Sequence, residues 1–378
     1  MAIQFCVKGN PYTEIPEIAK DSFFGSYNFE VFLNTSEDLK QLEKLVEDDL
    51  NQDRISTIHV PNKDRKGGTF FSLTSHNSKI SENSYQSLEA TVQTAANLGG
   101  KTVVIHGNAV DIDPLDYDND EATAIQESQK KLAQILTEVH NPKVKLALET
   151  QPRRVYDTIP NYGISANVTP KDFENIQFLM GNIPLHICFD AEHVYKAAIG
   201  EFFDGTLKEA INKERFKEIS KEYVYAMDKL YRDLIAKGLP EIEIYIKEFV
   251  NKFLKPNIIN KIAVVHACGY EWKNHCIFER RDFADLFIPR SHTPPVPGVF
   301  LYLDNTRIID QIDHVTYLKP LKDLKTKIPL VLEFDRTKRI DHPSFSDGIT
   351  YTNCEGIEYS FKRLVGISTK CLEEQINY

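Results

Sequence analysis

Eight short apolar runs, each rich in β-branched or aromatic residues, recur along this chain and alternate with longer amphipathic stretches. This alternation is typical of strands that lie parallel in one sheet, each joined to the next by a helix. The predicted strands are Ile3–Val7, Phe29–Phe32, Ile55–Val60, Thr102–His106, Val144–Glu149, Leu185–Asp190, Ile262–His266 and Pro329–Phe334. Eight such strands predict an α/β fold, a single (β/α)8 TIM barrel.

Apolar residues spaced three or four apart predict helices between these strands, most clearly over Glu37–Asp48, Tyr85–Leu98 and Ala122–His140. The chain has 378 residues, whereas a barrel of this type takes about 250. We assign most of the surplus to residues 200–260, between the sixth and seventh strands, where the pattern is helical without a strand. The sequence therefore predicts one barrel domain over residues 1–378 with a helical cap inserted at 200–260.

The overall charge of the chain argues against a simple electrostatic nucleic-acid binder. Lys and Arg number 45 against 55 Asp and Glu, which gives a net charge of -10, although basic residues can still gather in particular loops. The six cysteines form no CxxC pair, which suits a reducing compartment. No apolar run approaches the ~18 residues of a membrane span. We expect a soluble monomer of the cytoplasm or nucleus, with no membrane partner.

The most informative feature is the residue type at the strand ends. From the third run onward, each apolar run ends, or nearly ends, in an imidazole or a carboxylate. These residues are His59, His106, Glu149, Asp190, His266 and Glu333. Because the carboxyl ends of parallel strands open on the same face of a barrel, we expect the six side chains to meet at one mouth.

A metal cluster is the interpretation that explains all six residues together. Taken singly, a strand-end carboxylate is often only the N-cap of the next helix, and a histidine only a rim residue. Six such groups in one place would suffer desolvation and repulsion unless a cation neutralised them. Nitrogen and oxygen donors without thiolates suit zinc, manganese or iron. Two further candidates are His193, one turn beyond Asp190, and His292, in a proline-rich loop.

In order along the chain, these motifs resemble the endonuclease IV family of abasic-site endonucleases, within the xylose isomerase-like barrels. The resemblance implies eight metal ligands, namely His59, His106, Glu149, Asp190, His193, His266, His292 and Glu333. It also implies that Glu149 bridges two ions and that Glu149 and Glu333 are the catalytic carboxylates. The implied cofactor is zinc, two or three ions, with manganese as an alternative.

Two positions depart from the pattern of that family. The family has an aspartate two residues before its last histidine, where this chain has Arg290, so a third metal would keep only His193 and His292 of the usual set. The aromatic residue that the family uses to probe the DNA stack is replaced by Asn62. Basic loop residues and one phenylalanine are the predicted DNA contacts, namely Lys63, Arg65, Lys66, Phe70, Arg153 and Arg154.

The resemblance implies a zinc-dependent DNA repair endonuclease that hydrolyses the phosphodiester 5′ to an abasic site in double-stranded DNA and leaves a 3′-hydroxyl. The main alternative is a sugar isomerase or epimerase on the same fold, which needs only one metal. His59, His106 and His292 favour the nuclease, because a one-metal isomerase leaves them without a role. A UV-damage endonuclease and a non-catalytic binding module are the remaining alternatives.

Overall fold

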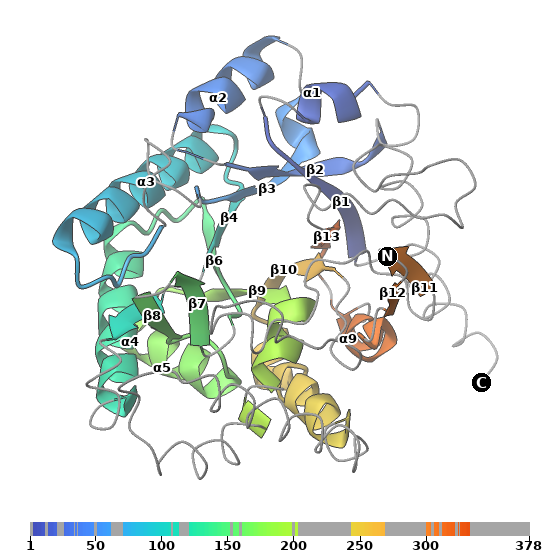
Figure 1. The fold of residues 1–378 in the computed structure, drawn as a ribbon. Helices are drawn as coiled ribbons and strands as arrows, with labels where there is room; N and C mark the ends of the chain where they lie inside the picture. Colours follow the sequence, from blue (N-terminus) through green and yellow to red (C-terminus); the bar gives the residue numbers. More distant parts are fainter. Residues whose placement is uncertain are drawn as a thin grey trace.

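Eight parallel strands close into a barrel in the computed structural model. The structure describes residues 3–11, 14–20, 26–33, 35, 37–48, 51–61, 71–106, 109–112, 121–151, 154–158, 161–198, 201–202, 243–268, 300–303, 306–309, 312–321, 324 and 326–332. The barrel strands are β1 (Ile3–Gly9), β2 (Asn28–Phe32), β3 (Ile55–His59), β4 (Thr102–Ile105), β6 (Lys145–Glu149), β9 (His186–Asp190), β10 (Ile262–Ala267) and β13 (Ile328–Leu332). Parallel pairing of β1 with β13 closes the ring (Figure 1). The predicted TIM barrel and all eight predicted strands are confirmed.

Helices lie outside the barrel and cover it (Figure 1). They are α1 (Ile15–Ile18), α2 (Asp38–Asp48), α3 (Ser78–Asn97), α4 (Glu121–Glu138), α5 (Pro170–Met180), α8 (Pro256–Ile259) and α9 (His314–Leu321), with a short 3-10 helix at Gln52–Arg54. Residues 191–198 and 243–253 are also helical. No helix of the described ranges is both long and apolar enough to cross a membrane.

One helix begins earlier than the apolar pattern predicts. The pattern predicts a start at Tyr85, whereas α3 begins at Ser78, because the side chain of Asn77 accepts hydrogen bonds from the backbone N–H groups of Lys79 and Ile80. The first turns then bury Ser81 and Ser84 rather than apolar residues. The spacing of apolar residues therefore does not predict these first turns.

Two small antiparallel sheets add strands that the sequence did not predict. One joins β5 (Ala109–Ile112), β8 (Asn161–Ser165) and β7 (Arg154–Thr158), and the other joins β11 (Phe300–Leu303) and β12 (Thr306–Ile309). They belong to the connections that follow β4, β6 and β10. Most of the predicted cap at 200–260 lies outside the described residues, so the cap stays a prediction.

A layer of small and branched side chains fills the barrel interior beneath the site. It consists of Cys6, Val104, Ala147, Cys188, Val264 and Val331. Because successive strand residues alternate between faces, the residue two positions further along points to the same side. On four of these strands, that residue is Lys8, Glu149, Asp190 or His266. The fold thus places polar groups directly above the packed layer, at the carboxyl ends of the strands.

Candidate metal centre

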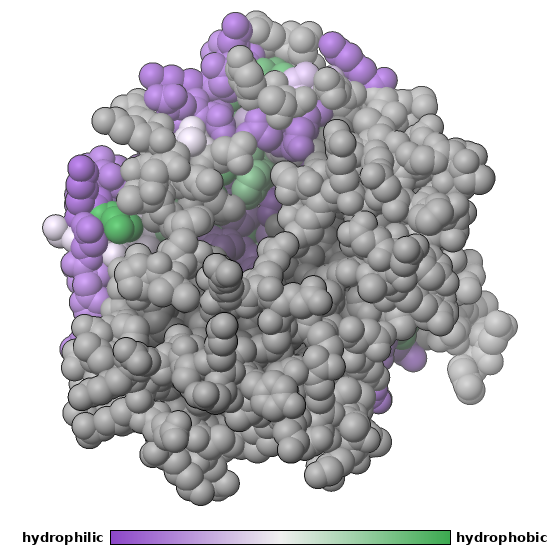
Figure 2. Space-filling model, in the orientation of Figure 1, coloured by the Kyte–Doolittle hydropathy of each residue, from purple (hydrophilic) through white to green (hydrophobic). Residues whose placement is uncertain are grey.

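Three buried side chains from neighbouring strands form the centre of the site. Glu149 ends β6, Asp190 ends β9 and His266 lies near the end of β10. One ligand atom from each lies within 4.8 Å of the others. Hydrophilic residues gather at the base of a hollow near the middle of the molecule (Figure 2). This group of two carboxylates and one imidazole is suited to hold a divalent ion.

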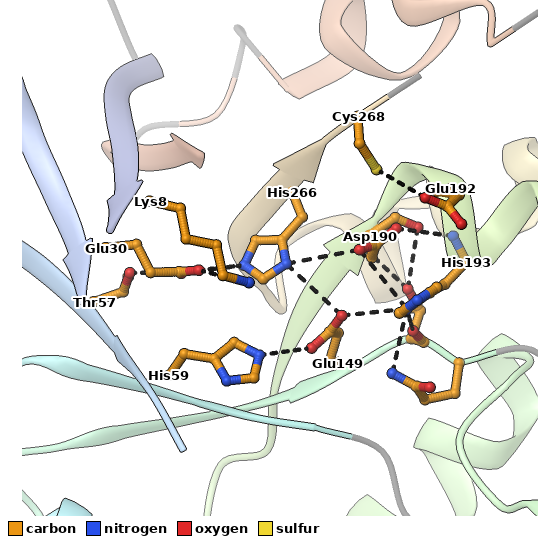
Figure 3. Close-up of polar contacts among 12 residues, drawn as sticks. Lys8, Glu30, Thr57, His59, Glu149, Asp190, Glu192, His193, His266 and Cys268 are labelled. Atoms are coloured by element: carbon orange, nitrogen blue, oxygen red, sulfur yellow. Dashed lines mark hydrogen bonds and ion pairs between the residues drawn. The ribbon is translucent and has the colours of Figure 1, made fainter. Parts of the chain in front are cut away.

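The two carboxylate oxygens of Glu149 face different histidines. Oε2 lies 3.2 Å from Nε2 of His59. Oε1 lies 3.2 Å from Nδ1 of His193 and 3.7 Å from Nδ1 of His266 (Figure 3). The ring of His106 is centred 5.7 Å from that of His59 and 6.1 Å from that of His193. Each oxygen of Glu149 therefore has at least one imidazole nitrogen beside it, which suits a bridging ligand.

Hydrogen bonds turn one nitrogen of His59 and one of His266 toward the carboxylates. Nδ1 of His59 lies 2.8 Å from the carbonyl oxygen of Val60. Because a carbonyl only accepts, Nδ1 carries the proton, and a neutral ring has its lone pair on Nε2. That lone pair faces a carboxylate oxygen 3.2 Å away. Two electron-rich atoms at this distance repel each other unless a proton or a metal ion lies between them.

Asp190 both caps a helix and keeps an oxygen for the site. Its Oδ1 accepts a hydrogen bond of 2.8 Å from the backbone N–H of His193 at the start of the helix over residues 191–198. Its buried Oδ2 makes no hydrogen bond within the described ranges, and Nδ1 of His193 and of His266 each lie 3.7 Å from it. A buried oxygen without a hydrogen bond is costly, and a metal ion would satisfy it.

The buried cluster holds more carboxylates than lysines. Four of its carboxylates, those of Glu30, Glu149, Asp190 and Glu192, are at most 2% exposed. Lys8 pairs with Glu30 and Lys196 pairs with Glu192. Four negative and two positive charges leave a net charge of minus two, and within the described ranges Glu149 and Asp190 form ion pairs with histidines only. The protonated His193 offsets part of this excess in the absence of metal, and bound divalent cations would offset the rest.

Donor type and spacing also fit a metal such as zinc. Two ligands at about 2.1 Å from a tetrahedral or octahedral ion are separated by roughly 3.0 to 3.4 Å. The contact of 3.2 Å between Oε2 of Glu149 and Nε2 of His59 lies in this range. Nδ1 of His193 instead donates to the carbonyl oxygen of Thr150, at 2.9 Å. The nearby thiol of Cys268 donates to Oε2 of Glu192 instead, at 3.5 Å. Nitrogen and oxygen donors therefore form the site, which suits zinc, manganese or iron.

The buried charges displace several pKa values in the metal-free protein. Burial raises the pKa of Glu149, but His106 and its other imidazole neighbours outweigh burial and hold that pKa well below its usual range. Burial lowers the pKa of His106 to about 4, despite the opposing charge of Glu149. Burial also lowers the pKa of His193, yet Asp190 and Glu149 raise it to about 9. His106 is thus neutral at neutral pH and His193 is protonated.

The metal-free protein is expected to be most stable near pH 6.5. Below that pH the unfolded chain protonates the equivalent of His106 while the folded chain does not, so stability falls toward pH 4. Above it the folded chain keeps the proton of His193 that the unfolded chain has lost, and this stabilisation disappears as the pH rises through about 9. Thermal unfolding of chelator-treated protein between pH 5 and 9 measures both effects. If the unfolding temperature does not change between pH 6.5 and 9, and His193→Gln has no effect on it, the raised pKa of His193 is contradicted.

The structure brings together six of the eight predicted metal ligands, namely His59, His106, Glu149, Asp190, His193 and His266. His292 and Glu333 lie outside the described residues, as does Arg290. The same holds for Lys63, Arg65, Lys66, Phe70 and Arg153, and only the backbone of Arg154 is described, in β7. The third metal site and the DNA contacts stay predictions.

Sequence reasoning missed several charged residues around the ligands. Glu30 and Lys8 lie beside His266, and Glu192 lies beside Cys268 and Lys196 (Figure 3). A signal for Glu30 was present in NFEVF, where one charged residue interrupts an otherwise apolar strand core. A signal for Glu192 was its place between two predicted ligands in Asp-Ala-Glu-His.

The barrel and this group of ligands define a family of enzymes. The sequence profile of the xylose isomerase-like TIM barrel family matches residues 23–322, and the chain belongs to this family. No curated protein matches the chain at the level of sequence. The family relationship is therefore carried by the profile.

Solved structures share the barrel at low sequence identity. An L-ribulose 3-epimerase is 12% identical, with a TM-score of 0.50, and the alignment covers 99% of this chain and 97% of that one. A 3-keto-D-glucoside 4-epimerase from E. coli is 11% identical, with a TM-score of 0.50 and coverage of 97% and 99%. Endonuclease IV from Thermus thermophilus is 13% identical, with a TM-score of 0.46 and coverage of 98% and 99%. At such identities the likeness concerns the fold alone.

Proposed function

We propose that this protein is a metal-dependent endonuclease that hydrolyses the phosphodiester 5′ to an abasic site in double-stranded DNA and leaves a 3′-hydroxyl. The observation that carries the proposal is the arrangement of Glu149, whose Oε2 faces His59 and whose Oε1 faces His193 and His266. A carboxylate with an imidazole beside each of its oxygens is suited to bridge two ions. Two ions a few ångströms apart support in-line phosphoryl displacement by neutralising charge on the attacking and leaving oxygens.

Five of the six described candidate ligands have a role in this proposal. His59 and His106 hold the ion on the Oε2 side of Glu149, while Asp190 and His266, with Glu333 as the predicted further ligand, hold the ion on the Oε1 side. The backbone of Glu149 is fixed from behind, because the side-chain amide of the buried Asn167 donates a 2.5 Å hydrogen bond to its carbonyl oxygen. Asn167 therefore holds in place the backbone that carries the proposed bridging carboxylate.

Abasic DNA is the substrate we favour for physical reasons. A nucleotide without a base does not stack, so turning it out of the duplex toward a deep site costs little free energy. Basic side chains such as Lys63, Arg65 and Arg153 would contact phosphates and position the duplex without reading its sequence. These contacts rest on the family resemblance and on the basic composition of the loops.

A sugar isomerase or epimerase is the second candidate, and one observation favours it. Glu149, Asp190 and His266 alone provide three ligands for a single ion, which is enough to polarise the oxygens of a ketose. The proximity of His59 to the same carboxylate argues for the nuclease, because a single ion on the Oε1 side leaves that imidazole without a role.

An incision assay tests the proposal directly. The protein, loaded with zinc or manganese, is incubated with a labelled duplex that carries one tetrahydrofuran abasic analogue, and with the same duplex without it. We expect a single cut on the 5′ side of the analogue and a product that a DNA polymerase extends, which reports a 3′-hydroxyl. Epimerisation of a ketose by the same preparation, without incision of the duplex, would reject the proposal in favour of the second candidate.

A further inference from the structure

A buried carboxylate on the far side of the barrel from Asp190 holds one of the ligands. Glu30 lies in the middle of β2 and is completely buried. Its two oxygens lie 3.0 and 3.1 Å from Nε2 of His266, which belongs to β10. The two strands are not neighbours in the barrel, since β1 and β13 lie between them. Glu30 therefore reaches His266 across the barrel interior (Figure 3).

Two other side chains hold Glu30 in this position. The hydroxyl of Thr57 donates a 2.8 Å hydrogen bond to Oε2 of Glu30, and Nζ of Lys8 lies 3.6 Å from Oε1. A buried carboxylate is expensive unless charged and hydrogen-bonding partners compensate it. Here a cation, a hydroxyl and an imidazole surround a group that does not itself face Asp190 or Glu149. These contacts hold the carboxylate of Glu30 in place beside His266.

The contact with Glu30 determines which nitrogen of His266 meets the carboxylates. Because an ionised carboxylate only accepts, Nε2 carries the proton that points to Glu30. Nδ1 is then the other nitrogen, and it lies 3.7 Å from Oε1 of Glu149 and 3.7 Å from Oδ2 of Asp190. Without Glu30, the imidazole could rotate or take the other tautomer, and Nδ1 would no longer be presented as a ligand.

We propose that Glu30, supported by Thr57 and Lys8, is a positioning residue that orients His266 as a metal ligand. The inference rests on the proposed metal centre and adds to it a residue that does not contact the metal. Partners of this type usually change metal affinity by about 10- to 100-fold. The expected effect therefore falls on metal binding itself and can be measured without any substrate.

Metal titration of Glu30 variants tests this inference. Chelator-treated protein is titrated with zinc against a competing chelator, and the cobalt-substituted protein is followed by its visible absorption. Glu30→Ala should weaken zinc binding by about 10- to 100-fold and change the cobalt spectrum. Glu30→Gln should be closer to the wild type, because its amide oxygen still accepts the proton of His266.

A buried carboxylate elsewhere provides the matched control. Asp172 is 6% exposed and lies in the first turn of α5, where its Oδ2 accepts from the backbone N–H groups of Val168 and of the N-cap residue Thr169. Asp172→Asn should lower the temperature of thermal unfolding and leave zinc affinity unchanged. If Glu30→Ala likewise lowers only thermal stability, with wild-type zinc affinity and an unchanged cobalt spectrum, the inference is overturned.

The design also covers a misfolded variant and a wrong proposed function. If Glu30→Ala does not fold, Thr57→Val removes one hydrogen bond from Glu30 at nearly constant volume and should still weaken zinc binding severalfold. Wild-type zinc affinity in a folded Thr57→Val would then reject the inference. If the wild-type protein does not cut abasic DNA but the Glu30 and Thr57 variants bind zinc more weakly, the nuclease is rejected and the positioning role of Glu30 is supported. If the wild-type protein cuts abasic DNA but the Glu30→Ala variant binds zinc normally, the nuclease is supported and the positioning role of Glu30 is rejected.

Discussion

Replacing Glu149 with glutamine is expected to lower incision of abasic DNA by at least about 100- to 1000-fold, since metal ions supply several kcal/mol of transition-state stabilisation and each 1.4 kcal/mol is about a factor of ten. The side-chain amide of glutamine has only one acceptor oxygen. It could therefore bind an ion beside His59 or an ion beside His193 and His266, but not both. Bound metal per chain should fall as well.

The fold is expected to survive this substitution. Glu149 lies above the packed interior layer that contains Ala147 rather than within it, so far-UV circular dichroism should not change. Glu89→Gln makes the same chemical change at an exposed position of α3 and should keep both activity and metal. Full activity of Glu149→Gln would show that this carboxylate does not hold the catalytic ions.

His59→Ala is expected to remove one ion per chain and nearly all incision. His59 lies beside Oε2 of Glu149 and is not a member of the group of Glu149, Asp190 and His266. One tightly bound ion should therefore remain, and metal analysis of the dialysed variant measures it. The same substitution should leave a one-metal sugar isomerase active.

A surface histidine provides the control for this prediction. His76 is exposed and lies before α3, so His76→Ala should keep the metal content and the activity of the wild type. A His59→Ala variant with undiminished metal content would mean that the Oε2 side of Glu149 holds no ion.

The barrel could be predicted from the sequence because each of its strands is buried on both faces. All five residues of β13, for example, are buried, and such strands appear as continuous apolar runs. The positions of Asp190 and Glu149 could be predicted because a charged residue that closes such a run must lie at the carboxyl end of the strand. Both signals are local in the sequence.

The remaining features depend on contacts between distant residues. Glu30 interrupts a strand in a way that also fits an ordinary polar face, and its partner His266 lies 236 positions further along the chain. The start of α3 was missed because its first turns bury serines such as Ser81 rather than apolar residues. Asp190 is both a helix cap, through Oδ1, and a candidate ligand, through Oδ2. The sequence cannot assign these roles to the two oxygens, because they depend on where each oxygen lies.

The metal content of the purified protein tests the central claim, a centre in which Glu149 bridges two ions. Elemental analysis against an accurate protein concentration, after dialysis without strong chelators, gives the number of tightly bound ions per chain. The arrangement of Glu149, with His59 on one side and His193 and His266 on the other, predicts two ions or more. A single ion per chain in a fully active preparation would contradict the claim and support a one-metal enzyme.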